Sequence, residues 1–90
     1  MKFKWDKNKA ATNLSKHNVS FDEAKTVFRN HFYIIFDDPV HSSEEDRYII
    51  IGQSVQRNLL FVSFTDKENV IRLISAREVT PSERQKYQEG

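Results

Sequence analysis

The sequence contains no cysteine and only two glycines and two prolines. The absence of cysteine excludes disulfide bonds, thiolate metal sites and cysteine nucleophiles. The scarcity of glycine and proline excludes collagen-like and linker-like chains. With 38% hydrophobic and 30% charged residues, the composition is that of a small globular protein, which packing or a partner must hold together.

Long apolar runs are also missing. The longest, residues 59–62, is far shorter than the ~18 residues that cross a bilayer. Charges at every second position of the first six residues exclude the apolar stretch of a secretory signal. The sequence therefore predicts a cytoplasmic protein that has no membrane contact. Its length predicts a single domain over residues 1–90 and excludes a two-domain enzyme.

The net charge of +1 is the sum of unlike segments. Residues 1–31 have seven Lys and Arg against three Asp and Glu, residues 32–54 have one against five, and residues 55–90 have six against five. The three segments therefore have net charges of +4, −4 and +1. A basic first third suits nucleic-acid phosphates or an acidic protein, and an acidic middle suits a basic partner.

Residue periodicity predicts eight elements. A strand is expected over 2–5, a helix over 7–16 with Asp6 as N-cap, and a second helix from Ser20 to about residue 29 with a Ser20–Glu23 capping box. Thr80 and Pro81 start a final helix. Four further strands are expected at 31–36, 47–53, 59–65 and 70–76.

Short turns link the last four strands, which predicts antiparallel neighbours. The fold class is therefore α+β, with an antiparallel sheet of about four to five strands, two N-terminal helices and one C-terminal helix. One face of such a sheet packs on helices, and the other is available for a ligand.

Motifs for metals and cofactors are absent. His17, His31 and His41 fall on different predicted elements and match no zinc or iron spacing. The glycine patterns of phosphate-binding loops, dinucleotide sites and nucleophile elbows do not occur. We expect no metal and no cofactor.

The arginines on predicted strands have two interpretations. Strict alternation along the last strand would place Arg72 and Arg77 on opposite faces. Arg72 would share its face with Val70, Ile74 and Ala76, and Arg77 would share the other with Ile71, Leu73 and Ser75. Arg47 opens an earlier strand. Arg47 and Arg72 either form structural ion pairs with Glu45, Asp37 or Asp66, or belong to a surface that binds phosphate.

Other polar residues have similar alternatives. His17 suits proton transfer near neutral pH, although a histidine in the last turn of a helix also interacts favourably with the helix dipole. Lys9 and Lys16 are expected on a solvated helix surface. Arg84 and Tyr87 are three residues apart and therefore neighbours on the last helix, where packing is the simpler role for the tyrosine.

Two blocks of the sequence form patterns long enough to identify a protein family. The first is Trp5-Asp6-x-x-Lys9-x-x-x-Asn13-x-x-Lys16-His17-x-Val19-Ser20-Phe21, and the second is Arg72-x-Ile74-Ser75-Ala76-Arg77. Between and after them stand Glu45-x-Arg47, Gly52 and Glu83-Arg84-x-x-Tyr87. In this order and spacing the chain resembles the BrnT toxin family. It departs from the family at Asn18, where glycine is common.

The resemblance implies a RelE-like fold with a twisted sheet, and a ribonuclease toxin of a type II toxin–antitoxin pair that arrests growth. It also implies a BrnA-like antitoxin that binds the toxin as a hetero-oligomer and blocks it. Operator DNA is then contacted only indirectly, through the antitoxin.

Metal-free RNA cleavage by the 2′-hydroxyl needs a base, an acid and cations around the reacting phosphate. His17 or Glu45 is the candidate base, Arg47, Arg72 and Arg77 are candidates for stabilising charge, and Lys16 or Tyr87 is the candidate donor or acid. Lys9, Lys16 and Arg84 are the candidate RNA-binding residues. The alternative is a non-catalytic nucleic-acid-binding or protein-interaction module, with the first two helices as a helix-turn-helix.

Overall fold

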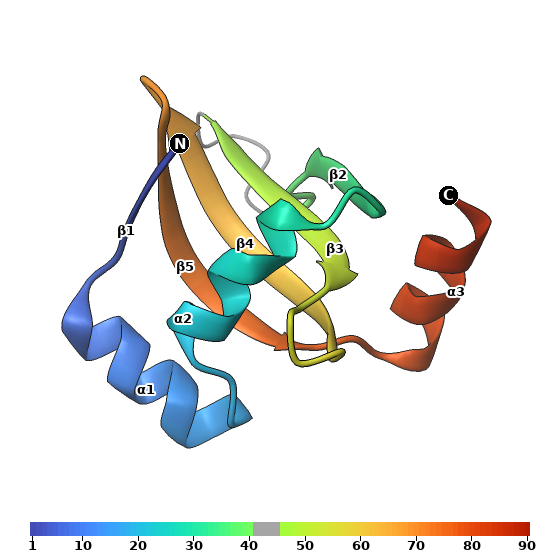
Figure 1. The fold of residues 1–90 in the computed structure, drawn as a ribbon, viewed down its shortest axis with the longest axis horizontal. Helices are drawn as coiled ribbons and strands as arrows, with labels where there is room; N and C mark the ends of the chain where they lie inside the picture. Colours follow the sequence, from blue (N-terminus) through green and yellow to red (C-terminus); the bar gives the residue numbers. More distant parts are fainter. Residues whose placement is uncertain (41–45) are drawn as a thin grey trace.

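The computed structural model describes residues 1–40 and 46–90 and has three α-helices, one 3₁₀ helix and five strands (Figure 1). In chain order they are β1 (Lys2–Lys4), α1 (Lys7–His17), α2 (Phe21–Ala24), the 3₁₀ helix η1 (Lys25–Arg29), β2 (Tyr33–Asp37), β3 (Arg47–Gln53), β4 (Leu59–Lys67), β5 (Val70–Glu78) and α3 (Pro81–Glu89). Each predicted element is present, with ends shifted by at most two residues, and the second helix is divided into α2 and η1.

The five strands form one mixed sheet in the order β1-β5-β4-β3-β2. Strands β2 to β5 are antiparallel to their sequential neighbours, as expected. The first strand differs, because β1 pairs in parallel with residues 70–72 of β5. The alternation in residues 2–5 identified a strand but contained no information on its partner or direction. The all-antiparallel expectation was therefore wrong at this edge of the sheet.

The first helix begins and ends at side-chain and backbone caps. The Asp6 carboxylate accepts hydrogen bonds from the backbone N–H groups of Asn8 and Lys9, at 2.8 and 3.0 Å. Asn18 ends the helix in the left-handed conformation, with φ of 57°, and its N–H donates to the Leu14 carbonyl. Asparagine tolerates this conformation better than most residues, so it can stand where a glycine is usual.

The second helix is one α-helical turn that continues as 3₁₀ helix. Ser20 caps it by accepting from the Glu23 N–H, but the Glu23 side chain does not complete the expected capping box. The buried Glu23 carboxylate instead accepts from Ser54 Oγ at 2.6 Å and Asn58 Nδ2 at 2.8 Å, which ties α2 to the β3–β4 turn. Such a short, buried segment cannot serve as the recognition helix of a helix-turn-helix.

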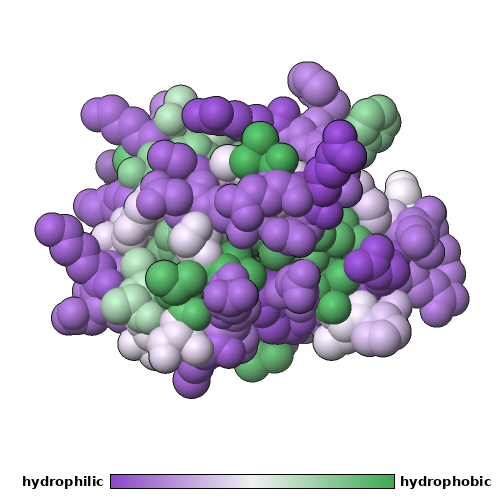
Figure 2. All heavy atoms as spheres, turned by 60° about the horizontal axis from the view of Figure 1, so that its bottom comes forward, coloured by the Kyte–Doolittle hydropathy of each residue, from purple (hydrophilic) through white to green (hydrophobic). Residues whose placement is uncertain are grey.

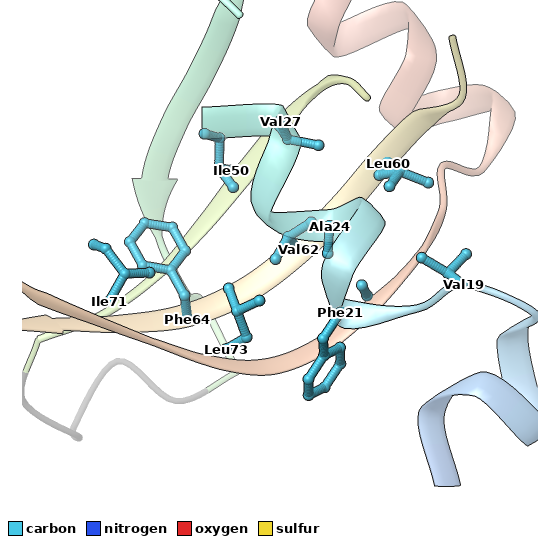
Figure 3. Packing of buried hydrophobic residues seen from close by; sticks show 11 residues of the cluster. Val19, Phe21, Ala24, Val27, Ile50, Leu60, Val62, Phe64, Ile71 and Leu73 are labelled. Atoms are coloured by element: carbon cyan, nitrogen blue, oxygen red, sulfur yellow. The ribbon is translucent and has the colours of Figure 1, made fainter. Parts of the chain in front are cut away.

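The hydrophobic core lies between the sheet and the α2–η1 segment (Figure 3). We call this side of the sheet the α2 face, and the opposite side the α3 face. Side chains that alternate along the strands fill the core, and each is at most 3% exposed. The buried cluster is Val19, Phe21, Ala24, Val27, Ile50, Leu60, Val62, Phe64, Ile71, Leu73 and Ala76.

The third helix starts at a complete capping box between Thr80 and Glu83 and contacts the α3 face. The Lys86 ammonium lies 3.8 Å from the ring centroid of Phe36, and the Tyr87 hydroxyl donates to the Phe32 carbonyl at 2.8 Å. No residue of α3 is buried. Polar and cation–π contacts, rather than a hydrophobic stripe, therefore hold this helix.

The first helix is joined to the sheet through Asn13. Its carboxamide accepts from the Ala76 N–H at 2.9 Å and donates to the Ala76 carbonyl at 2.8 Å, as a neighbouring strand would. The same amide nitrogen donates to the Val19 carbonyl at 2.9 Å. Since β1 covers only residues 70–72, Asn13 satisfies backbone groups on the part of β5 that β1 does not reach.

We predict that Asn13→Ala lowers the free energy of unfolding by about 2–3 kcal/mol, because it leaves buried backbone groups of Ala76 without partners. Urea unfolding followed by circular dichroism measures this difference. Asn8→Ala on the same helix is the matched control and should change stability far less, since Asn8 is exposed. Equal effects of the two substitutions would contradict this role of Asn13.

Candidate functional site

A β-bulge in β5 decides which way the arginines of this strand point. Ser63 of β4 pairs with Ser75, but the next residue, Phe64, pairs with Leu73, so Ile74 has no partner. The bulge reverses the alternation, and Ala76 joins Leu73 in the core. The prediction that Arg72 and Arg77 lie on opposite faces was therefore wrong, because both lie on the α3 face.

Arg47 lies on the same face. The register pairs Arg47 with Thr65, and Thr65 with Arg72, while Lys4 of β1 pairs with Arg72 from the other side. Three cationic side chains thus stand in one row across the sheet. Arg47 forms an ion pair with Asp38, whose Oδ2 is 3.5 Å from Nε, rather than with Asp37 or Asp66. Glu45, the third expected partner and a candidate base, lies outside the described residues.

Arg77 lies further along the same face and already has a carboxylate partner. Its two terminal nitrogens donate to the two Glu83 oxygens at 2.8 and 2.9 Å, and its guanidinium stacks 4.1 Å from the Phe61 ring centroid. The hydrogen bond to Glu83 raises the pKa of Arg77, and the same hydrogen bond lowers the pKa of Glu83 although burial opposes it. Glu83 therefore neutralises much of the charge of Arg77.

A groove of about 370 Å³ runs between α1 and β5. Lys9, Lys16 and His17 line it from one stripe of the helix, since residues seven and eight apart lie on the same side of an α-helix. Asn8, Thr12 and the buried Asn13 of the helix also line it, and Ile74 and Ser75 of the bulge form the opposite wall. Three of the predicted site residues therefore meet in a single groove.

Arg72 acts electrostatically on the start of α1. The pKa of Asp6 is lowered first by the backbone N–H groups of Lys9 and Asn8, and the positive charges of Lys9 and Arg72 lower it further. Arg72 is exposed, whereas Arg47 and Arg77 are partly buried against carboxylates. Arg72 is therefore the arginine of the set most available to an anion beside the groove.

Tyr87 and Arg84 are placed elsewhere. Tyr87 binds the Phe32 carbonyl at the start of β2, whereas the groove borders β5, and β4 and β3 lie between. Three strand spacings of ~4.8 Å separate these places by roughly 14 Å. Arg84 is exposed on the same helix as Tyr87. The structure thus brings His17, Lys9 and Lys16 together, leaves Tyr87 at the β2 side of the sheet, and keeps Arg84 outside the groove.

Two serines were missed by the sequence reasoning. Ser75 lines the groove, and its cross-strand neighbour Ser63 is 5% exposed. Within residues 1–40 and 46–90, the Ser63 hydroxyl is buried without a hydrogen-bond partner. The bulge decides which way Ser75 points, and the sequence pattern does not reveal the bulge. The only sequence signal for a role of Ser75 was therefore its position inside the Arg72–Arg77 block.

The described residues contain no group of three or more His, Asp or Glu side chains arranged to hold a metal ion. Hydrophilic residues cover most of the side seen in Figure 2, and small apolar patches separate them. In the part of the chain that the structure describes, none of the helices has the length and apolar character of a membrane span.

We predict that the ion pair between Arg77 and Glu83 makes stability depend on pH. Because folding lowers the pKa of Glu83 below its ordinary value of 4.5, the stabilisation is complete above that pH and disappears as the pH falls through the lower folded value. The difference in unfolding free energy between the unchanged protein and Glu83→Gln should therefore shrink between pH 6 and pH 3. Glu78→Gln, at an exposed residue, should show no such trend.

Comparisons with known proteins agree with the fold. The protein-family model described as "Ribonuclease toxin, BrnT, of type II toxin-antitoxin system" matches residues 5–83. The chain is similar to the crystal structure of the Brucella abortus ribonuclease toxin BrnT, with a TM-score of 0.70, 24% sequence identity, and coverage of 89% of this chain and 97% of that one. No curated protein matches the chain. Because the family model covers nearly all of the sequence, the chain belongs to the BrnT family of ribonuclease toxins of type II toxin–antitoxin systems.

Proposed function

We propose that this toxin cleaves RNA without a metal ion, by attack of the 2′-hydroxyl on the adjacent phosphate, and that the reaction takes place in the groove between α1 and β5. The observation that supports this most is the convergence of Lys9, Lys16 and His17 on one groove whose opposite wall is the β5 bulge. In this proposal the toxin acts in the cytoplasm, arrests growth, and is neutralised by a BrnA-like antitoxin.

The groove offers the groups that the reaction requires. The attacking hydroxyl needs a base, and His17 supplies the imidazole among the lining residues, a group suited to proton transfer. The phosphate becomes more negative in the transition state, and the ammonium groups of Lys9 and Lys16 lie along the same wall of the groove. Lys16, next to His17 in the same groove, would donate the proton to the leaving oxygen. These residues would make the groove both a binding site and a reaction centre.

Arg72 extends the cationic surface along β5, and the Ser75 hydroxyl supplies a neutral donor between Arg72 and Arg77. A single RNA strand that follows β5 would meet these side chains in succession. Arg47, two strands away from Arg72, would contact the RNA beyond the reaction centre. Arg84 and Tyr87 lie on α3, outside the groove, so we assign them RNA binding rather than proton transfer.

The proposed metal-free mechanism can be tested directly. Purified toxin should cleave single-stranded RNA in the presence of excess EDTA, and the products should end in 2′,3′-cyclic phosphate, because the 2′-oxygen remains bonded to phosphorus after attack. Mass spectrometry of the fragments checks the ends. Loss of cleavage in EDTA with recovery on adding Mg²⁺ would contradict the metal-free mechanism, as would fragments that end in 5′-phosphate.

Substitutions in and beside the groove test whether cleavage takes place there. His17→Ala should lower the rate of RNA cleavage by about 10²–10⁴-fold, since a general base typically contributes that much. His31→Ala is the matched control, because His31 is exposed outside this groove, and it should keep the full rate. Arg72→Ala should cost about 10²–10³-fold, while Arg29→Ala on η1 should cost little.

Single-turnover kinetics on a short RNA, with binding measured separately by fluorescence anisotropy, distinguishes loss of chemistry from loss of affinity. The assignment of the arginines fails if Arg72→Ala and Arg77→Ala both keep full cleavage and full growth arrest. Salt-sensitive RNA binding with no cleavage by the unchanged toxin would favour the alternative of a non-catalytic binding module.

A further inference from the structure

A second groove, of about 160 Å³, lies on the α2 face at the other side of the sheet. The α2–η1 segment covers only part of this face, and beyond Phe28 apolar side chains of several strands remain accessible. Tyr33 and Ile35 of β2 are 43% and 48% exposed. The lining residues are Met1, Phe28, Tyr33, Ile35, Tyr48, Phe64, Asp66 and Ile71.

The strand β2, which borders this groove, is an edge of the sheet formed by the described strands. Strand β2 pairs with β3 on one side only, and the sheet order places nothing on its other side among the described strands. Soluble proteins usually protect such edges with lysine, proline or a bulge. The segment Tyr33–Asp37 has none of these, and its residues before Asp37 are all apolar or aromatic. Such an edge readily adds a strand from another chain.

The charges around the groove indicate the chemistry of that chain. Asp66 lies in the groove, and Asp37 shares the exposed side of β2 with Tyr33 and Ile35. A second copy of the toxin would bring two sets of these carboxylates to one seam, because a two-fold interface places the same surface on both sides. A segment with alternating apolar residues and nearby Lys or Arg would instead complement both features.

We propose that the antitoxin inserts such a segment here, as a strand added to β2, with apolar side chains packed against Tyr33 and Ile35 and a cationic side chain facing Asp37. This inference rests on the proposed function only in taking the antitoxin as the partner. It separates the two surfaces: the antitoxin binds at β2, and RNA binds beside β5, with β3 and β4 between them. Affinity for the antitoxin and RNA cleavage should therefore respond to different substitutions.

The test measures antitoxin affinity and RNA cleavage on the same variants of the full chain. The probe is the purified antitoxin encoded beside the toxin gene, titrated by calorimetry, and circular dichroism confirms folding. Ile35→Lys should weaken binding by about 10- to 100-fold, as expected for a central interface residue, and should leave cleavage by free toxin unchanged. Val55→Lys is the matched control, because Val55 is exposed and apolar but lies in the β3–β4 turn.

A second pair of variants tests the charge and does not depend on how Ile35→Lys folds. Asp37→Lys on β2 should weaken antitoxin binding, whereas Asp22→Lys on α2, where the carboxylate is also exposed, should not. The proposal is overturned if Ile35→Lys and Asp37→Lys bind the antitoxin as tightly as their controls. It is also overturned if free toxin is a dimer that Ile35→Lys dissociates, or if Ile35→Lys lowers RNA binding as much as antitoxin binding.

Failure of the proposed function gives a different pattern. If the unchanged toxin cleaves no RNA but Ile35→Lys still loses antitoxin affinity while Val55→Lys does not, the ribonuclease mechanism is wrong and the docking surface is supported. If His17→Ala abolishes cleavage while the two docking-surface variants and their two controls bind the antitoxin equally, the ribonuclease mechanism is supported and the docking surface is wrong.

Discussion

The pairing of the Asn13 carboxamide with the backbone of Ala76 is the contact on which the arrangement of the molecule depends most. Strand β1 is only three residues long, so most of β5 would otherwise expose an unpaired edge. The side chain of Asn13 replaces the missing strand with two hydrogen bonds. In doing so it fixes α1 alongside β5, and the groove exists because these two elements are held together.

The bulge at Ile74 acts together with this contact. Without the bulge, Ala76 and Arg77 would exchange faces of the sheet, and the Arg77 guanidinium would point toward the core where Ala76 now packs. One additional residue in β5 therefore keeps both a hydrophobic residue beneath Asn13 and a continuous polar surface beside the groove. Bulges commonly re-aim side chains next to functional sites in this way.

Much of the fold could be predicted from the sequence because the relevant signals are local. Asp6, Ser20 and Thr80 each accept a hydrogen bond from a backbone N–H two or three residues later, so short patterns identify them. The bulge and the direction of β1 could not be predicted, because both depend on pairing between distant segments. Glu23 is an instructive case: Ser54 and Asn58, about thirty residues away, offer its carboxylate buried partners that the local capping box cannot match.

The candidate site also has parts that could be predicted from the sequence and parts that could not. The stripe of Lys9, Lys16 and His17 follows from helical spacing and was predictable as a stripe, although its position opposite Ser75 was not. The ion pair of Arg47 with Asp38 requires the chain to turn between β2 and β3, so sequence distance gave no preference for Asp38 over Asp37. The separation of Tyr87 from His17 follows from strand order, which residue patterns do not encode.

The way α3 is attached has a consequence for the dynamics of the toxin. Because none of its residues is buried and its contacts to the sheet are an ion pair, a cation–π contact and a hydroxyl hydrogen bond, its detachment exposes little apolar surface of its own. The free energy of local opening should therefore be well below that of global unfolding. The amide hydrogens of α3 would exchange with solvent long before those of β4, and salt would speed that exchange by screening the contact between Arg77 and Glu83. We therefore expect the C-terminal helix to open separately while the sheet stays closed.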